Sequence, residues 1–171
     1  FVRLSLPAVS PLATIILVHG GYWKNKYTVD NAAMSTLPEA LIAAGFAAVE
    51  VEYRRRDDEG GGWPGTCDDM VAALAHVRHL CLSGAPGWSQ LDAGSFVLLG
   101  HSAGGHGALV VAHRAAVCLT VAVAPVADLV AGYERRLSDE GDAVLRFLGT
   151  EYEQDPQLYR DASPAHTMLP L

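Results

Sequence analysis

The chain has 171 residues, of which 50% are hydrophobic and 18% are charged, and its formal net charge is −7. This length and composition suit a single domain over residues 1–171 with a sizeable core. The acidic balance disfavours nucleic acid and anionic membrane surfaces as partners. No apolar run approaches the roughly 20 residues that a transmembrane helix needs, so we expect no membrane partner.

The first elements predicted are two buried strands with a helical segment between them. The run Thr14–Val18 (TIILV) has the continuous apolar character of a strand buried on both faces, and residues 46–53 (FAAVEVEY) form the next strand. Residues 1–13 are either the tail of an earlier strand or a loop. Residues 30–44 are predicted to be helical in two pieces, with a capping box from Thr36 to Glu39 and Gly45 as the stop.

A charged loop and a long helix follow. Residues 54–62 (RRRDDEGGG) could bind an anion, but a charge run of this kind is more often a solvated loop with local pairing. Thr66 and Asp69 form a second capping box in front of an amphipathic helix. His76 and His79 lie three apart on that helix without an evident third ligand, so we expect no metal site.

The most informative stretch contains Gly100-His101-Ser102-Ala103-Gly104, a G-x-S-x-G pattern. It follows the apolar run 96–99, which predicts a buried strand, and it precedes apolar residues at helical spacing. A sharp turn between strand and helix presents a serine hydroxyl to a base and a substrate. The flanking positions must then be small, and Gly100 and Gly104 meet this need. We therefore predict that Ser102 is a catalytic nucleophile; the alternative is a glycine-rich turn that happens to contain a serine.

A second motif, His19-Gly20-Gly21-Tyr22-Trp23, follows the first predicted strand. Loops of the H-G-G type supply backbone N–H groups that bind the oxyanion in lipases and esterases. We expect the N–H groups of Gly21, Tyr22 and Ala103 to form such an oxyanion hole. Tyr22 and Trp23 are candidates for the wall of an aromatic substrate pocket, although a packing role explains both residues equally well.

Together, HGGYW and GHSAGGH resemble the arylformamidase (kynurenine formamidase) branch of the α/β-hydrolases and its esterase relatives. The resemblance extends to EYR at 52–54, APVADL at 124–129, FLG at 147–149 and Ser163-Pro164. It implies a mostly parallel sheet flanked by helices and a Ser–Asp–His triad. It also implies a substrate such as N-formylkynurenine, or a related small ester or amide, and no metal or other cofactor.

The catalytic acid and base are harder to place. After Ser102, a strand is expected at 117–123 and short helices at 128–136, 139–148 and 156–160, with an irregular segment from Ser163. His106 belongs to the GHSAGGH motif and is expected to be a helix-packing residue. His113 lies further along the same helix, too far from Ser102 to act as its base. Asp128 and His166 remain weak candidates for acid and base; as a helix N-cap, Asp128 needs no catalytic role.

The resemblance places the acid after a further strand, so the chain is expected to be a partial α/β-hydrolase domain, a fragment that ends before its Asp and His. The strands alternate with helices, which predicts an α/β fold with a mostly parallel sheet. The predicted function is hydrolysis of small acyl substrates through an acyl-enzyme on Ser102, with the fragment itself weakly active or inactive. The alternative is a non-catalytic binding module of the same fold.

The three cysteines, Cys67, Cys81 and Cys118, are odd in number and fit no metal spacing. They favour reduced thiols and a cytoplasmic location. A small-molecule acyl substrate is the expected partner, and nothing in the sequence indicates an oligomeric state.

Overall fold

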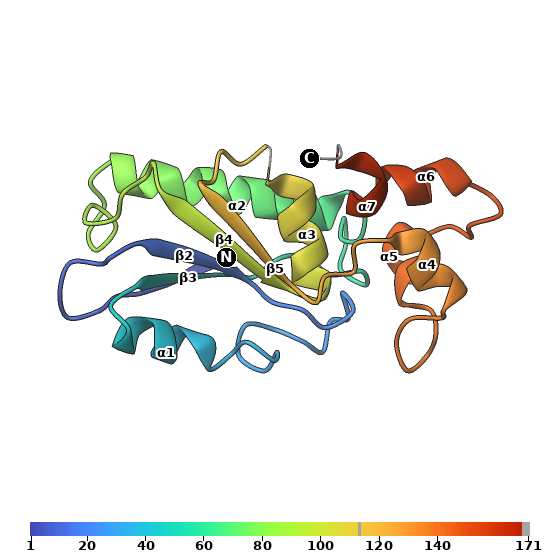
Figure 1. The fold of residues 1–171 in the computed structure, drawn as a ribbon, viewed down its shortest axis with the longest axis horizontal. Coiled ribbons are helices and arrows are strands. Elements are labelled where there is room, and N and C mark those ends of the chain that lie inside the picture. The colour runs from blue at the N-terminus through green and yellow to red at the C-terminus, as the bar shows by residue number, and fades with distance from the viewer. Residues whose placement is uncertain (113, 169–171) are drawn as a thin grey trace.

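The computed structural model describes residues 1–112 and 114–168. Its centre is a five-stranded sheet with the strand order β1-β3-β2-β4-β5 (Figure 1). The strands are β1 (Val2–Ser5), β2 (Thr14–Val18), β3 (Ala47–Val51), β4 (Phe96–His101) and β5 (Leu119–Val123). All neighbours run parallel except β1, which pairs antiparallel with β3 at one edge. The prediction of an α/β fold with a mostly parallel sheet is therefore confirmed.

Helices lie on both faces of the sheet and beyond one end of it (Figure 1). They are α1 (Leu37–Ala43), α2 (Gly65–Leu82), α3 (Ala103–Val111), α4 (Leu129–Glu134), α5 (Ala143–Leu148), α6 (Pro156–Asp161) and α7 (Pro164–Thr167). Among the helices described, none is long and apolar enough to span a membrane.

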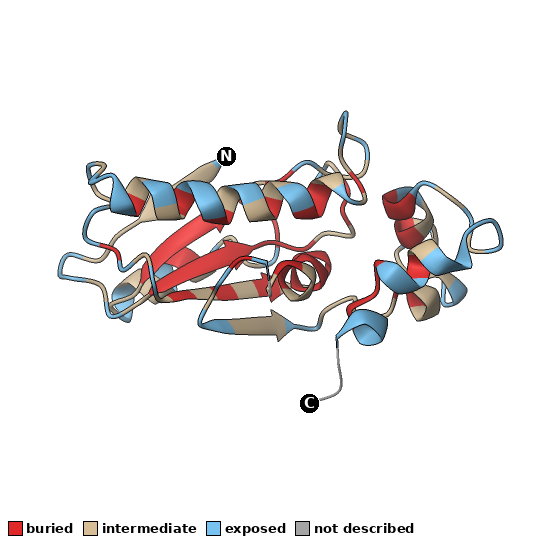
Figure 2. Cartoon of the chain, turned by 90° about the horizontal axis from the view of Figure 1, so that it is seen from above, coloured by how far each residue is buried: buried red, intermediate tan, exposed pale blue. Residues whose placement is uncertain are grey.

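The central strand β2 shows why these apolar runs become strands. Ile16 and Val18 pack with residues of α2 and α3, whereas Ile15 and Leu17 pack against the α1 side. Side chains alternate between the faces of a strand, so a strand covered on both faces must be apolar at every position. All five residues of β2 and of β3 are buried. In contrast, β5 forms an edge and is only partly covered (Figure 2).

A second apolar cluster joins the C-terminal helices to the turn after β2. Trp23, in that turn, packs with Leu129 of α4, with Phe147 of α5 and with Tyr159 of α6. Two ion pairs reinforce the contact: Lys24 pairs with Glu140, and Arg56 lies 3.4 Å from Asp142. The helices after β5 are therefore attached to the same sheet end at which β2 and β4 finish.

Three local predictions were wrong. Only residues 37–43 of the segment 30–44 are helical, and the preceding stretch forms turns, one of them held by the Asn31 side chain on the N–H of Thr28 at 2.8 Å. Thr36 makes no capping hydrogen bond, because its backbone is already in the helical region. The segment after Ser163 is the short helix α7 rather than an irregular stretch.

The second capping box was also wrong, because both of its polar side chains bind the arginine loop instead. The Thr66 hydroxyl donates to the carbonyl of Arg54 at 2.6 Å, and the Asp69 carboxylate accepts from the Arg54 backbone N–H at 2.9 Å. The neighbouring arginines also form ion pairs, Arg55 with Asp58 and Arg56 with Asp142. The charged loop is thus paired with carboxylates, as the second interpretation held, but the side chains of Arg55 and Arg56 are only 16% and 5% exposed and Asp142 is distant in the sequence, so the loop is neither solvated nor paired only locally.

Candidate active site

Ser102 occupies a strained turn between β4 and α3. Its backbone has φ 54° and ψ −116°, a conformation that non-glycine residues rarely adopt and that is concentrated at functional sites. Three backbone hydrogen bonds hold the turn: the Ser102 N–H donates to the carbonyl of Val123 at 2.9 Å, and the Ser102 carbonyl accepts from the N–H groups of His106 at 3.0 Å and Val126 at 3.3 Å. This is the strand–turn–helix geometry that a nucleophile elbow requires.

The glycines of the motif permit close backbone contacts. A Cβ atom on Gly100 would stand 2.3 Å from the carbonyl oxygen of Gly104. A Cβ atom on Gly104 would stand 2.2 Å from the carbonyl oxygen of Val18, at the end of β2. Both distances are far inside van der Waals contact, so glycine at position 100 lets α3 begin this close to β4, and glycine at position 104 lets the elbow lie this close to the end of β2.

The HGG turn lies directly against this elbow. A Cβ atom on Gly20 would be 2.9 Å from the Cβ of Ser102 and 2.8 Å from the carbonyl oxygen of His101. Gly21 and Tyr22 follow with φ 121° and φ 55°, so the chain turns sharply as it leaves β2. The two motifs, about 80 residues apart in the sequence, meet because β2 and β4 are parallel neighbours that finish at the same edge.

Two adjoining cavities open at this junction, and Tyr22, Ser102 and Ala124 line both of them. The first has a volume of about 320 Å³ and also contacts Gly20, Gly21 and His101. The second has a volume of about 440 Å³ and extends along α4 past Asp128 and Arg135. Ala103 opens α3 and is fully buried behind Ser102. Its N–H belongs to the first helical turn, where N–H groups have no partner inside the helix.

The arrangement therefore brings Ser102, Gly21 and Tyr22 to one cavity, with Ala103 directly adjoining in the chain. Such an arrangement has a hydroxyl group beside a space that fits a carbonyl group. It also has N–H groups at the start of a helix, which suit a developing negative charge.

Trp23 is not at either cavity. It is 1% exposed, stacks on Phe147 with a centroid separation of 4.1 Å, and meets the edge of His106 at 5.5 Å. The expectation that it walls the substrate pocket is corrected: the packing alternative describes its position. Trp23 is a buried member of the apolar cluster formed with the C-terminal helices, whereas Tyr22 only borders that cluster and lines both cavities.

Asp128 and His166, the weak candidates for acid and base, lie in contact with each other. Asp128 Oδ1 lies 3.5 Å from His166 Nε2, and both side chains are about 40% exposed. Asp128 is also the N-cap of α4, because its Oδ1 accepts from the N–H of Ala131 at 3.0 Å. Asp128 lines the larger cavity, whereas His166 is not among the residues that line it.

His106 is buried, and its Nε2–H donates to the carbonyl of Ala162 at 2.8 Å. Burial lowers the pKa of His106 to about 4, although the bond to Ala162 opposes this shift. The ring is therefore neutral at physiological pH, and it packs α3 against the aromatic rings of Trp23 and Phe147, the packing role expected for it. His113 lies outside the described residues.

Three further residues at the cavities were not predicted from the sequence. Tyr27 covers the turn: a Cβ atom on Gly21 would meet its ring at 2.5 Å. His101 directly precedes Ser102, and Ala124 follows β5 with φ 45°. The last two are at strand carboxyl ends, so the rule that sites gather at that edge of a parallel sheet could have found them.

Similar proteins place this geometry in a known class. The model of the BD-FAE family matches residues 4–168, and the chain belongs to that family. Its fold is that of the α/β-hydrolases.

Individual proteins that resemble this chain are described as esterases. The chain is 32% identical over 115 residues to the probable mitochondrial carboxylesterase 4 of Arabidopsis thaliana, which corresponds to 61% of this chain and 30% of that protein. It superposes on a brefeldin A esterase, a bacterial homologue of human hormone sensitive lipase, with a TM-score of 0.72 and 25% identity over 97% of this chain and 51% of the esterase. A truncated carbohydrate esterase from gut microbiota gives a TM-score of 0.76 at 19% identity over 96% and 66% of the two chains.

The chain thus spans about half of the brefeldin A esterase and less than a third of the plant carboxylesterase.

Proposed function

We propose that this chain provides the nucleophile and the oxyanion hole of a serine hydrolase that acts on small acyl substrates. The observation that carries the proposal is the contact between the HGG turn and the strained Ser102 elbow at one cavity. Ser102 Oγ attacks the carbonyl carbon while a base takes its proton. The N–H groups of Gly21, Tyr22 and Ala103 bind the oxyanion. The leaving group departs with a proton, and water then releases the acid from the acyl-enzyme.

The substrate we propose is an aryl formamide such as N-formylkynurenine, with small carboxylic esters as the wider class. Two features support a small substrate with an aromatic part: the cavities have volumes of about 320 and 440 Å³, and Tyr22 lines both of them. The esterase relatives support the ester class, whereas the HGGYW and GHSAGGH motifs support the formamide.

We propose that the acid and base of the complete enzyme come from the segment that the arylformamidase resemblance implies after residue 171. Asp128 is engaged as the N-cap of α4, and His166 does not line the cavity beside Ser102. Neither geometry favours a role in activating Ser102.

A non-catalytic binding module is the second candidate. It is favoured by one observation: among the described residues, no histidine donates to or accepts from Ser102 Oγ. Such a module would use the same cavity to hold a ligand without turning it over.

A fluorophosphonate probe separates the two candidates, because it labels an activated serine and leaves an inert one unmodified. We expect the full-length protein to be labelled, the 171-residue piece to be labelled poorly, and Ser102→Ala to abolish labelling. Parallel assays with N-formylkynurenine and p-nitrophenyl acetate then compare the two substrate classes. Turnover of the ester alone rejects the formamide; absence of both labelling and turnover in the full-length protein rejects the hydrolase.

A further inference from the structure

Glu52 is a buried carboxylate at the end of β3 that the mechanism above does not use. Its side chain is 10% exposed and is surrounded by three donors. His19 Nε2 lies 3.1 Å from Oε1, and the guanidinium of Arg55 lies 2.8 Å from the same oxygen. The backbone N–H of Val29 donates to Oε2 at 3.0 Å. A charged group this well enclosed in hydrogen bonds organises the segments that donate to it.

The first of these segments is the start of the HGG turn. The His19 ring is fixed on every side: it stacks on Tyr53 at 4.5 Å, and its Nδ1 contacts the carbonyl of Gly20 at 2.8 Å. The Tyr53 hydroxyl also donates to the His19 carbonyl at 2.7 Å. Both ring nitrogens face oxygen atoms, Nδ1 that of Gly20 and Nε2 that of Glu52, so the orientation of the ring is fixed.

The second segment covers the turn from outside. Arg55 donates to the carbonyl of Tyr27 at 3.0 Å, and the Tyr27 ring lies against Gly21. Glu52 therefore reaches the turn twice, once through His19 and once through Arg55 and Tyr27. Val29 adds a third tie, two residues beyond Tyr27.

The carboxylate is held in its charged form. Burial alone would raise the pKa of Glu52, but the hydrogen bonds from His19 and Val29 act in the opposite direction. The positive charges of His19 and Arg55 add to their effect, and together these contacts lower that pKa below its ordinary value.

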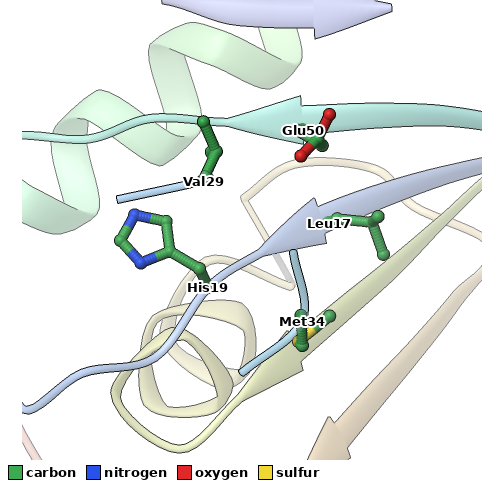
Figure 3. A pocket seen from close by; sticks show the side chains of 5 residues that line it. All are labelled: Leu17, His19, Val29, Met34 and Glu50. Carbon is green, nitrogen blue, oxygen red and sulfur yellow. The ribbon is translucent and has the colours of Figure 1, made fainter. Parts of the chain in front are cut away.

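Figure 3 shows the space behind this contact. The His19 ring lies beside Val29, and Glu50 stands further back on β3. The hollow that these side chains line has a volume of about 10 Å³, so it is far too small for a substrate. The region behind the turn is packed support and not part of the cavity at Ser102.

We propose that Glu52 is a positioning residue for the oxyanion turn: by holding His19 and residues 27–29, it keeps the N–H groups of Gly21 and Tyr22 directed at the cavity beside Ser102. The inference rests on the proposed function, because a turn with no oxyanion to bind needs no such precision. Glu52 acts through the turn and does not contact the substrate.

The test is Glu52→Gln in the full-length protein, assayed with p-nitrophenyl acetate. Gln keeps the size of the side chain and removes its charge. We expect kcat to fall by roughly 10- to 100-fold with KM within about threefold, because removal of one oxyanion donor costs about 10²- to 10³-fold and here the donors are displaced rather than removed. Glu52→Asp, which restores the charge, should recover part of the loss.

Glu50→Gln is the matched control. Glu50 lies on the same strand, its side chain is 7% exposed, and it binds a single arginine, Arg3, with two contacts at 2.7 and 2.8 Å. It should lower the unfolding midpoint as much as Glu52→Gln does and leave the turnover rate unchanged. An equal loss of turnover in both variants, or turnover by Glu52→Gln within twofold of wild type, overturns the proposal.

A second measurement does not need activity. In NMR spectra, the amide resonances of Gly20, Gly21 and Tyr22 should shift or broaden in Glu52→Gln and stay in place in Glu50→Gln. If the wild-type protein hydrolyses nothing, the proposed function fails while this comparison still decides whether Glu52 holds the turn. Unchanged amide resonances in Glu52→Gln refute its positioning role.

Discussion

Gly20 lies against Ser102 so closely that a methyl group on Gly20 would stand 2.9 Å from the serine Cβ. This contact joins a turn at residue 20 to an elbow at residue 102, and both depend on β2 and β4 being parallel neighbours. The site is therefore a property of the sheet edge, and small changes in backbone bulk at that edge should affect chemistry before they affect folding.

Gly20→Ala should reduce the rate of fluorophosphonate labelling of the full-length protein by at least about tenfold, because the added methyl pushes the HGG turn away from the elbow and misplaces reacting groups. Gly94→Ala is the control, since its new methyl meets only the Asp92 side chain, at 3.3 Å. Labelling of Gly20→Ala at the wild-type rate contradicts the expected contact.

Gly104→Ala and Gly107→Ala should differ in stability although their new methyl groups meet atoms at 2.2 and 2.3 Å. At Gly104 the obstacle is the Val18 backbone, so we expect a loss of about 1–3 kcal/mol or more. At Gly107 the obstacle is the end of the flexible Met70 side chain. There the gain in helix propensity, about 1 kcal/mol, offsets much of the strain. Urea unfolding of both variants checks this; equal losses would show that backbone and side-chain obstacles are equivalent here.

Tyr22 and Trp23 should separate function from stability. Trp23→Ala removes a buried stacked ring and should destabilise the fold by about 3–5 kcal/mol. Tyr22→Ala should leave stability within about 1 kcal/mol, because Tyr22 is only partly buried. Since Tyr22 lines both cavities, we expect its removal to lower kcat/KM for an aryl substrate more than for acetate esters. Thermal unfolding measures the loss of stability, and parallel assays measure kcat/KM for the two kinds of substrate. A change in KM caused by the single substitution Trp23→Phe would contradict the packing role and show that Trp23 contacts the substrate.

Asp128→Asn distinguishes a cap from a catalytic acid, because Asn caps helices as well as Asp does. We expect the free energy of unfolding to stay within about 0.5 kcal/mol of wild type and ester turnover to stay within about threefold in the full-length protein. His166→Asn should behave alike. If ester turnover instead falls by two orders of magnitude in both variants, the Asp128–His166 pair is the activating dyad.

Stability should fall as the pH is lowered from 6.5 towards 4, in part through His106. Its pKa is lowered from 6.5 to about 4 in the folded protein by burial. Below pH 6.5 the unfolded chain therefore binds a proton that the folded chain does not bind, and folding becomes less favourable until about pH 4. This shift corresponds to about 3 kcal/mol. Urea titrations at pH 7, 5.5 and 4.5 measure the free energy of unfolding, which should depend less steeply on pH in His106→Gln than in the wild-type protein. Equal pH dependence in the two proteins would show that His106 does not contribute.

The sequence predicted the parts of this fold that rest on continuous apolar runs or on glycine. The run 14–18 is recognisable as a buried strand from its own residues, without knowledge of the neighbouring strands. The spacing of Gly100, Ser102 and Gly104 is likewise enough to predict the turn between strand and helix. The second capping box failed because a pattern of four residues does not reveal a competitor: Thr66 and Asp69 bind Arg54, which is 12 and 15 positions away in the chain. The support by Glu52 was invisible for the same reason, since its partners come from three separate segments.

Ser102 and the HGG turn are anchored on two adjacent central strands, whereas the far wall of the larger cavity comes from α4, outside the sheet. Substitutions along that helix can therefore remodel the shape and polarity presented to an incoming molecule without moving Ser102. The wall that an incoming molecule meets and the position of the serine hydroxyl are therefore structurally independent features of this fold.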